Sequence, residues 1–318
     1  MSKKIQVEIV DASRVIINKG SKSFAAAAKF FDVETRENAY MLYAWCRRCD
    51  DVIDNQELGF NSRPQNAEKT QKALIQLQEK TRFAIDDSPS DDPVFEGLRY
   101  VLNRNQIPER YPLELLKGFA MDAAGHEFRS FDDTLQYCYY VAGVVGIMMA
   151  YIMGARDPEI LERAADLGIA FQLTNIARDV REDTEVGRIY LPGDWLAEAG
   201  IPADQILHPQ YASALVKVVE RLLNEADRYY TSANEGLRAL GFRSAWAVAA
   251  ARVVYRAIGD LVRERGELAW QDRVIVNKGS KILGVAEGML DAARATLVDR
   301  HTSAAPRDAN LWSASQID

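Results

Sequence analysis

Apolar residues recur at intervals of three and four along most of this chain. Clear examples are TRENAYMLYAWCRRCDDVID at residues 35–54 and ALVKVVERLLNEADRYYTSANEGLRAL at residues 214–240. This spacing is typical of helices that bury one face. No run alternates convincingly between apolar and polar residues, and no Asn-Gly or Asp-Gly pair marks a hairpin. The pattern therefore predicts an all-α fold.

The ten prolines lie at the ends of these helical stretches and punctuate them. A chain of 318 residues is long enough for two domains. However, no linker rich in glycine, serine or proline divides it. We therefore predict one domain over residues 1–300, followed by a flexible tail at residues 301–318.

One segment is apolar enough to resemble a membrane span. Residues 137–155, YCYYVAGVVGIMMAYIMGA, contain no charge over 19 positions, and a helix needs about 20 residues to cross a bilayer. The segment is rich in tyrosine and glycine, and Arg156 and Asp157 end it. We predict a buried core helix, and a helix lining an apolar substrate cavity would have the same composition.

Charge and cysteine content narrow the class of protein. The formal net charge of -7 argues against a nucleic-acid binder held by a basic surface. Three cysteines do not form a disulfide framework in a chain of this length, which favours a reducing, cytoplasmic setting. The N-terminus lacks the pattern of a signal peptide. Cys46 and Cys49 have metal-binding spacing, but no second pair or nearby histidine accompanies them, so no zinc site is expected.

A first carboxylate cluster follows the apolar stretch YMLYAW. At 100° per residue, Tyr43, Arg47, Asp50 and Asp54 share one face of a helix. One interpretation is a solvated acidic face. Against it, the two aspartates repel each other and weaken the helix unless a cation lies between them.

A second cluster, FQLTNIARDVRED at residues 171–183, places Gln172, Asn175, Asp179 and Asp183 on one helix face. Asparagine and aspartate are poor helix formers, and burying them is costly unless they are paired or coordinated. Polar bridging between helices is the alternative for one such cluster alone. Two clusters together favour facing strips of oxygen ligands, which suit Mg²⁺ or Mn²⁺ bound with a diphosphate. Nearby arginines would hold the phosphate oxygens.

Five motifs carry a family resemblance: GSKSFAAAAKFF, YAWCRRCDDVID, YCYYVAGVVG, FQLTNIARDVRED and GRIYLP. Together they resemble the phytoene synthases of the squalene/phytoene synthase family, from about Ser13 to about Lys281. The resemblance implies an isoprenoid synthase fold, a helical bundle around a central cavity. It also implies a Mg²⁺-dependent prenyltransferase that joins two geranylgeranyl diphosphates head to head. The implied reaction passes through prephytoene diphosphate and yields phytoene and diphosphate. It is the first committed step of carotenoid biosynthesis.

The resemblance also assigns residues to roles. The metal ligands it implies are Asp50, Asp54, Asn175, Asp179 and Asp183. The four aspartates of this set are expected to be catalytic, together with Gln172 near the reacting carbons. The residues expected to contact diphosphate or close the site are Ser21, Ser23, Arg47, Arg178, Arg188, Tyr190, Tyr255 and Arg273, with Asp51 nearby. The cavity-lining aromatics are Phe24, Tyr43 and Tyr137, whose ring faces would stabilise a carbocation, although core packing is an equal explanation for each.

Two rival functions stay open. A related enzyme would make dehydrosqualene or squalene from farnesyl diphosphate, and squalene synthesis would end with reduction by NADPH, which we do not expect here. A non-catalytic assembly protein of the same fold is the other rival, although both aspartate motifs are complete. The expected ligand is geranylgeranyl diphosphate. The lipid-soluble product suggests peripheral membrane contact, and other carotenoid-pathway enzymes are candidate partners.

Overall fold

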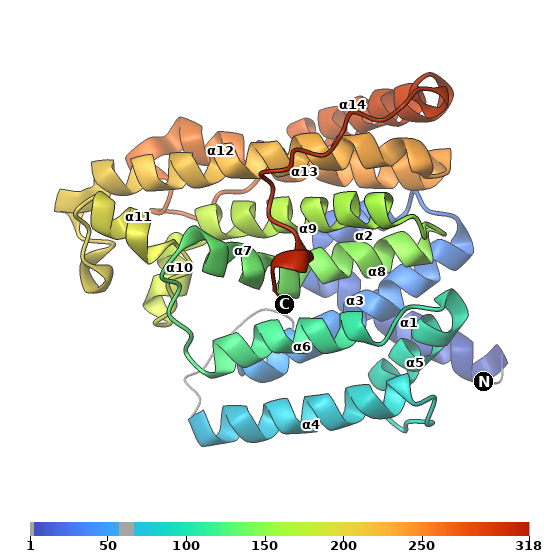
Figure 1. Cartoon of the computed structure of the whole chain (residues 1–318). Coiled ribbons are helices and arrows are strands. Elements are labelled where there is room, and N and C mark those ends of the chain that lie inside the picture. Colours follow the sequence, from blue (N-terminus) through green and yellow to red (C-terminus); the bar gives the residue numbers. More distant parts are fainter. Residues whose placement is uncertain (1–2, 57–66, 318) are drawn as a thin grey trace.

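The computed structural model describes residues 3–56 and 67–317, and it contains helices and no strand within those ranges (Figure 1). The first half of the chain forms α1 (Lys3–Gly20), α2 (Lys22–Ala28), α3 (Val33–Ile53), α4 (Ala67–Ile85), α5 (Pro93–Asn105), α6 (Arg110–Ala123), α7 (Phe131–Cys138) and α8 (Val144–Ile152). The second half forms α9 (Pro158–Arg178), α10 (Val180–Glu185), α11 (Gly193–Glu198), α12 (Ala212–Gly236), α13 (Phe242–Arg265) and α14 (Lys278–Leu297). The predicted all-α fold is confirmed.

Short helical turns complete the connections. A π-helical turn, η1 (Tyr139–Gly143), joins α7 to α8. Single 3₁₀ turns lie at Ala203–Gln205, Pro209–Tyr211, Leu237–Ala239, Gly266–Leu268, Asp299–His301 and Ala314–Gln316.

The two helices that carry the acidic motifs begin at well-defined caps. The Asp32 carboxylate accepts a hydrogen bond from the Thr35 amide at the start of α3. The Asp157 carboxylate accepts one from the Glu159 amide at the start of α9, where Pro158 occupies the first turn. Both helices run 21 residues from these caps, which places each acidic motif at a helix C-terminus.

The core helix predicted over residues 137–155 corresponds to the end of α7, η1 and α8, and the observed helix begins earlier, at Phe131, and ends at Ile152. Within the described ranges, Phe131–Ile152 is the one helix long and apolar enough to span a membrane, and 61% of its most apolar window is buried. It packs against α6 and α9 in the interior of the bundle. This burial agrees with the core interpretation of the segment.

Two glycines bring this helix close to α9. A Cβ atom at Gly146 would lie 2.2 Å from the carbonyl oxygen of Ala164, and one at Gly168 would lie 2.2 Å from that of Ala142. No side chain fits either position without moving the backbone of the facing helix. The missing side chains therefore set the spacing between α8 and α9.

Part of the C-terminal segment, for which a flexible tail is expected, packs against the bundle. Leu311 and Trp312 are buried, and the Trp312 amide donates to the Tyr229 hydroxyl over 3.1 Å. The Arg307 guanidinium also makes two hydrogen bonds to the buried Asp166 carboxylate. The segment has no helical periodicity from which this packing could be predicted. A domain limit at residue 300 stays a prediction, but these contacts tie the residues beyond it to the bundle.

Candidate active site

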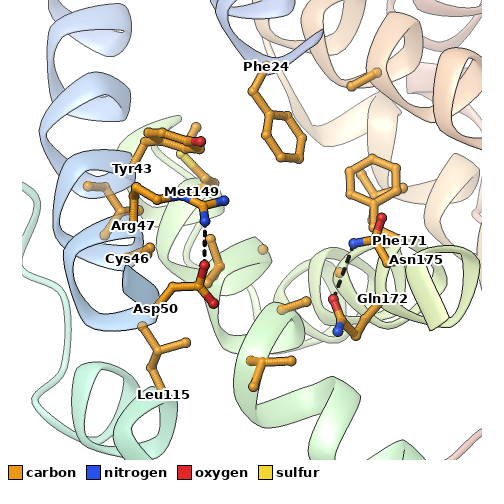
Figure 2. Close-up of a pocket in the computed structure, with 18 of the residues that line it drawn as sticks. Phe24, Tyr43, Cys46, Arg47, Asp50, Leu115, Met149, Phe171, Gln172 and Asn175 are labelled. Atoms are coloured by element: carbon orange, nitrogen blue, oxygen red, sulfur yellow. Dashed lines mark hydrogen bonds and ion pairs between the residues drawn. The ribbon is translucent and has the colours of Figure 1, made fainter. Parts of the chain in front are cut away.

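A cavity of about 660 Å³ lies inside the bundle, between the two acidic motifs. Figure 2 shows side chains from α3 on one side and from α9 on the other pointing into it. Most of the remaining lining is apolar, including Phe31, Val141, Met149, Met153, Leu237, Leu240 and Val248. The volume and the mixed lining are typical of a small-molecule site in which a few polar groups orient an apolar ligand.

The first wall comes from the last turn of α3. Arg47 forms an ion pair with Asp50 and lies 3.7 Å from an oxygen of Asp51. The Gln56 amide nitrogen donates to Asp54 over 2.8 Å and approaches Asp50 at 3.4 Å. Asp50 and Asp54 thus face the cavity, as the helical arithmetic predicts.

The second wall comes from α9 and α10. The Asn175 amide nitrogen donates to Gln172 Oε1 over 3.3 Å, as Figure 2 shows. Asp179 does not continue the helix as expected. It lies between α9 and α10, with φ of -100° and ψ of 19°. The chain resumes its helical course at once, because the Asp183 amide donates to the Asp179 carbonyl over 2.9 Å, so both carboxylates still line the cavity.

Arginines pair with the carboxylates of both walls. Arg178 holds Asp179 through two hydrogen bonds, and a nitrogen of Arg273 lies 3.4 Å from the same carboxylate. Arg188 forms an ion pair of 2.6 Å with Asp54. Four arginines, Arg47 included, therefore surround the acidic groups and could equally bind phosphate oxygens.

Enclosure and mutual repulsion make the carboxylates difficult to ionise. Desolvation raises the pKa of Asp50 to about 7, and the charges of neighbouring aspartates add to this while Arg47 opposes it. Desolvation and the charge of Asp179 raise the pKa of Asp183 to about 8, against the effect of Arg188. A cation placed among these groups would favour their ionised forms.

The donor set fits a divalent cation shared with a ligand. The Asn175 side-chain oxygen is buried and accepts no hydrogen bond from the part of the chain that the structure describes. Among those same residues, no three histidine, cysteine or acidic side chains lie close enough to enclose an ion by themselves. Mg²⁺ commonly takes one or two carboxylates and completes its shell with waters and phosphate oxygens, which matches two separated walls.

One partly buried carboxylate escaped the sequence analysis. Asp122 on α6 lines the cavity and accepts hydrogen bonds from the hydroxyls of Tyr137, over 2.9 Å, and Tyr190, over 2.8 Å. The two tyrosine rings stack with their centroids 4.8 Å apart. Burial raises the pKa of Asp122 to about 6, although Arg188 and the tyrosine hydroxyl oppose the shift. Its signal in the sequence is weak, a single acid on the same helical face as Leu115 and Phe119.

A cluster of aromatic rings lies above the acidic end of the cavity. The Phe24 ring is 6.3 Å from that of Tyr43 and 5.3 Å from that of Tyr255, measured between centroids. Phe171, which the sequence analysis did not select, lines the cavity and packs 4.3 Å from Tyr255. It directly precedes Gln172, so its ring and the amide leave the same turn of α9 (Figure 2).

The cavity brings together most of the predicted site residues. Those that line it are Phe24, Tyr43, Arg47, Asp50, Asp54, Tyr137, Gln172, Asn175, Arg178, Asp179, Asp183, Arg188, Tyr190 and Arg273. The described lining does not include Ser21, Ser23, Asp51 or Tyr255. The Ser21 hydroxyl instead caps α2 by accepting from the Phe24 amide over 3.3 Å, and Tyr255 packs behind Phe24 and Phe171.

This fold and cavity define an all-α isoprenoid synthase. The model of the squalene/phytoene synthase family matches residues 17–280, and the chain belongs to that family. It is 46% identical to the 15-cis-phytoene synthase of Pantoea ananas, over 92% of this chain and 94% of the relative. It is 48% identical to the 15-cis-phytoene synthase of Enterobacter agglomerans, over 92% and 98%.

Solved structures share this fold. A crystal structure of a dehydrosqualene synthase in complex with a ligand superimposes with a TM-score of 0.80 at 29% identity, covering 89% of this chain and 96% of that one. The squalene synthase HpnC from Alicyclobacillus acidocaldarius superimposes with a TM-score of 0.72 at 22% identity, covering 82% and 95%. The second match supports the fold alone.

Proposed function

We propose that this chain is a phytoene synthase, a prenyltransferase that joins two geranylgeranyl diphosphates into phytoene. The observation that carries the proposal is the pair of facing acidic walls, with their arginines, in a cavity of about 660 Å³ whose remaining lining is mostly apolar. The identity of 46% and 48% to two bacterial 15-cis-phytoene synthases over nearly the whole chain supports this product.

The acidic walls and their arginines hold the diphosphates in this proposal. Asp50, Asp54, Asn175, Asp179 and Asp183 would bind Mg²⁺, or Mn²⁺ in its place. When bound, the ion supplies stabilisation of the negative charge that develops on the leaving diphosphate. Arg47, Arg178, Arg188 and Arg273 then exchange carboxylate oxygens for phosphate oxygens, which guanidinium groups bind with the same geometry.

The apolar cavity and its aromatic rings hold the hydrocarbon chains. Loss of the first diphosphate leaves an allylic cation, and the double bond of the second substrate attacks it. Loss of a proton then closes the cyclopropane ring and gives prephytoene diphosphate. This intermediate ionises, rearranges and loses a proton to give phytoene. Phe24, Tyr43 and Phe171 exclude water and present ring faces that stabilise positive charge. Gln172 also lines the cavity, and in this proposal it acts near the reacting carbons.

Asp122 and its two tyrosines position one wall of the site in this proposal. The carboxylate fixes both hydroxyl groups, and its negative charge acts on Arg188, the partner of Asp54. Tyr137 and Tyr190 thereby keep one orientation toward the cavity.

The setting we propose is cytoplasmic, with contact at a membrane and no requirement for NADPH. All three cysteines are free thiols in the structure, as a reducing compartment would keep them. The substrate and product are lipid-soluble, so exchange with a membrane, or with other enzymes of carotenoid synthesis, follows from the proposed reaction.

The direct test is incubation of the purified protein with Mg²⁺ and either geranylgeranyl or farnesyl diphosphate, without NADPH. We expect phytoene from the longer substrate, detected by chromatography and mass spectrometry. The match to a dehydrosqualene synthase at a TM-score of 0.80 makes that enzyme the second candidate. A product from farnesyl diphosphate alone would favour it, and no product from either would favour a non-catalytic protein.

A pair of substitutions tests the acidic walls. We expect Asp50→Asn and Asp179→Asn each to lower turnover by about 100-fold or more, because each removes stabilisation of the departing charge. Glu127→Gln is the matched control, since its side chain is 82% exposed and lies outside the cavity lining. Near-normal turnover in either wall variant would contradict the assigned roles.

A further inference from the structure

The helix α14 packs on the bundle through its smallest residues. Gly284, Gly288 and Ala292 are buried against α13. A Cβ atom at Gly288 would lie 2.5 Å from the backbone nitrogen of Ala250. The inner face of α14 therefore holds the helix close to α13 and contributes little apolar side-chain surface of its own.

The large apolar residues of α14 lie on its opposite face. Ile282, Leu283 and Leu290 are 70%, 71% and 67% exposed, Leu297 is 73% exposed, and Met289 is 41% exposed. At 100° per residue these positions fall within an arc of about 120°. A surface helix normally turns such an arc toward the core, whereas α14 turns it away. Figure 1 shows α14 in the outermost layer of the molecule.

The exposed apolar surface continues toward the cavity. Ile275, 68% exposed, lies in the segment that leads into α14. It follows Arg273 by two residues, and Arg273 lines the cavity and contacts Asp179 at 3.4 Å. Exposed apolar side chains thus occur from Ile275, two residues from the cavity-lining Arg273, to the end of α14. We call Ile275, Ile282, Leu283, Leu290 and Leu297 the α14 band.

Cationic residues border this band. From Arg273 to His301 the chain carries five lysines and arginines against three acidic residues, although its overall net charge is -7. Lys278 and Lys281 lie in the first turn of α14, and Arg294, 79% exposed near its end, pairs with Asp299 at 3.5 Å. One of the acids, Asp291, pairs with Arg252 of α13. An apolar arc edged by lysine and arginine is the pattern of helices that lie in the interface of an anionic bilayer.

We propose that the α14 band docks this protein on an anionic lipid bilayer, with α14 lying in the interface beside the acidic end of the cavity. The proposal rests on the proposed function for its purpose, since prenyl substrates and the hydrocarbon product reside in lipid. A bilayer fits the band better than a protein partner does, because the band lies on a single outward helix bordered by cations. Docking in this orientation places the Arg273 end of the cavity next to the membrane surface.

Vesicle flotation tests the proposal without reference to activity. The protein is mixed with vesicles of phosphatidylethanolamine and phosphatidylglycerol and floated through a density gradient. We expect the unmodified protein to float, and a Leu283→Ser/Leu290→Ser variant to partition at least about 10-fold less. Ile75→Ser/Phe83→Ser on α4 is the matched control, because these residues are also exposed, at 46% and 58%, and it should float like the unmodified protein.

The proposal would be overturned if the unmodified protein did not float, or if the α14 and α4 variants floated equally. It would also be overturned if the protein formed a dimer without lipid and the α14 substitutions abolished that dimer. Circular dichroism checks the fold, and Ile275→Ser, outside any helix, replaces the double variant if helicity falls. Turnover of detergent-dispersed geranylgeranyl diphosphate should be equal in all variants. If neither the unmodified protein nor any variant turned over the substrate, the proposed function would be refuted. The flotation result would still decide the membrane-docking proposal on its own.

Discussion

Replacing Arg307 by alanine should destabilise the whole bundle, although only eleven residues follow Arg307 in the sequence. The guanidinium donates to the two oxygens of Asp166 over 2.9 Å and 2.8 Å, and it also donates to the Trp312 carbonyl over 2.7 Å. Asp166 is fully buried on α9, the helix that carries the second acidic motif. Its remaining hydrogen bond comes from the Ser232 hydroxyl over 2.5 Å.

The expected cost follows from the carboxylate that is left behind. Removing one partner of a buried ion pair usually costs about 3–5 kcal/mol, because the other charge stays in a low-dielectric site. Arg163 lies close enough to relieve part of this charge, so we expect about 3 kcal/mol. Urea denaturation followed by circular dichroism at neutral pH measures the loss. Limited proteolysis should at the same time cleave the C-terminal segment sooner, because Leu311 and Trp312 lose their anchor.

Two companion variants separate this explanation from others. In Asp166→Leu/Arg307→Met both charges are absent, and most of the stability should return, since apolar residues often replace a buried pair without loss. Arg228→Ala removes an exposed pair with the neighbouring Asp308 and should change stability little. An Arg307→Ala protein within 1 kcal/mol of the unmodified one would refute the reasoning, and so would a double variant as unstable as the single one.

Two further predictions concern the glycine contact and the acidic walls. Gly146→Ala should lower the free energy of unfolding in urea by about 2–3 kcal/mol, because its Cβ would meet the Ala164 carbonyl at 2.2 Å, whereas Gly241→Ala, with no atom within 4 Å, should have little effect. In the metal-free protein, Asp183→Asn should raise the melting temperature at pH 8 and leave it unchanged at pH 4, as measured by calorimetry. The sign follows because folding raises the pKa of Asp183 to about 8 from about 4, so the unfolded chain releases the proton first and stability falls across that interval. The same difference in melting temperature between the variant and the unmodified protein at pH 8 and at pH 4 would contradict this prediction.

The helices of the bundle could be predicted from the sequence because their apolar spacing is strong. The ends of the helices are harder to predict, since they depend on local hydrogen bonds. The spacing of polar residues predicts one helix that continues to Asp183, but the helix is interrupted at Asp179. The spacing alone contains no sign of this interruption. The contacts of the C-terminal segment could not be predicted for a related reason. Arg307, Leu311 and Trp312 are held by tertiary contacts with α9 and α12, which no local periodicity records.

The acidic site could be predicted because carboxylates at helical spacing are unusual in otherwise apolar helices. Asp50, Asp54, Asp179 and Asp183 all face the cavity. Ser21 looked equally suitable by its motif, but its hydroxyl is used as a helix cap. Asp122 and Phe171 gave no comparable signal, because a lone acid or a lone aromatic on an apolar face has several explanations. Only the packing of α6 and α9 around the cavity distinguishes them from ordinary core residues.

The position of both acidic motifs at helix C-termini explains why the site needs its arginines. Asp54 caps α3 and Asp179 caps α9, so the partial negative charge of each helix end adds to that of the carboxylates. Without a ligand, Arg188 and Arg178 balance this charge through the ion pairs with Asp54 and Asp179. In the proposed reaction, a diphosphate that arrives with divalent ions would give every group a new partner, phosphate for the guanidiniums and metal for the carboxylates. Binding would then replace ion pairs that already exist and leave no charge unpaired in the enclosed site, which is the condition under which buried charges are tolerated.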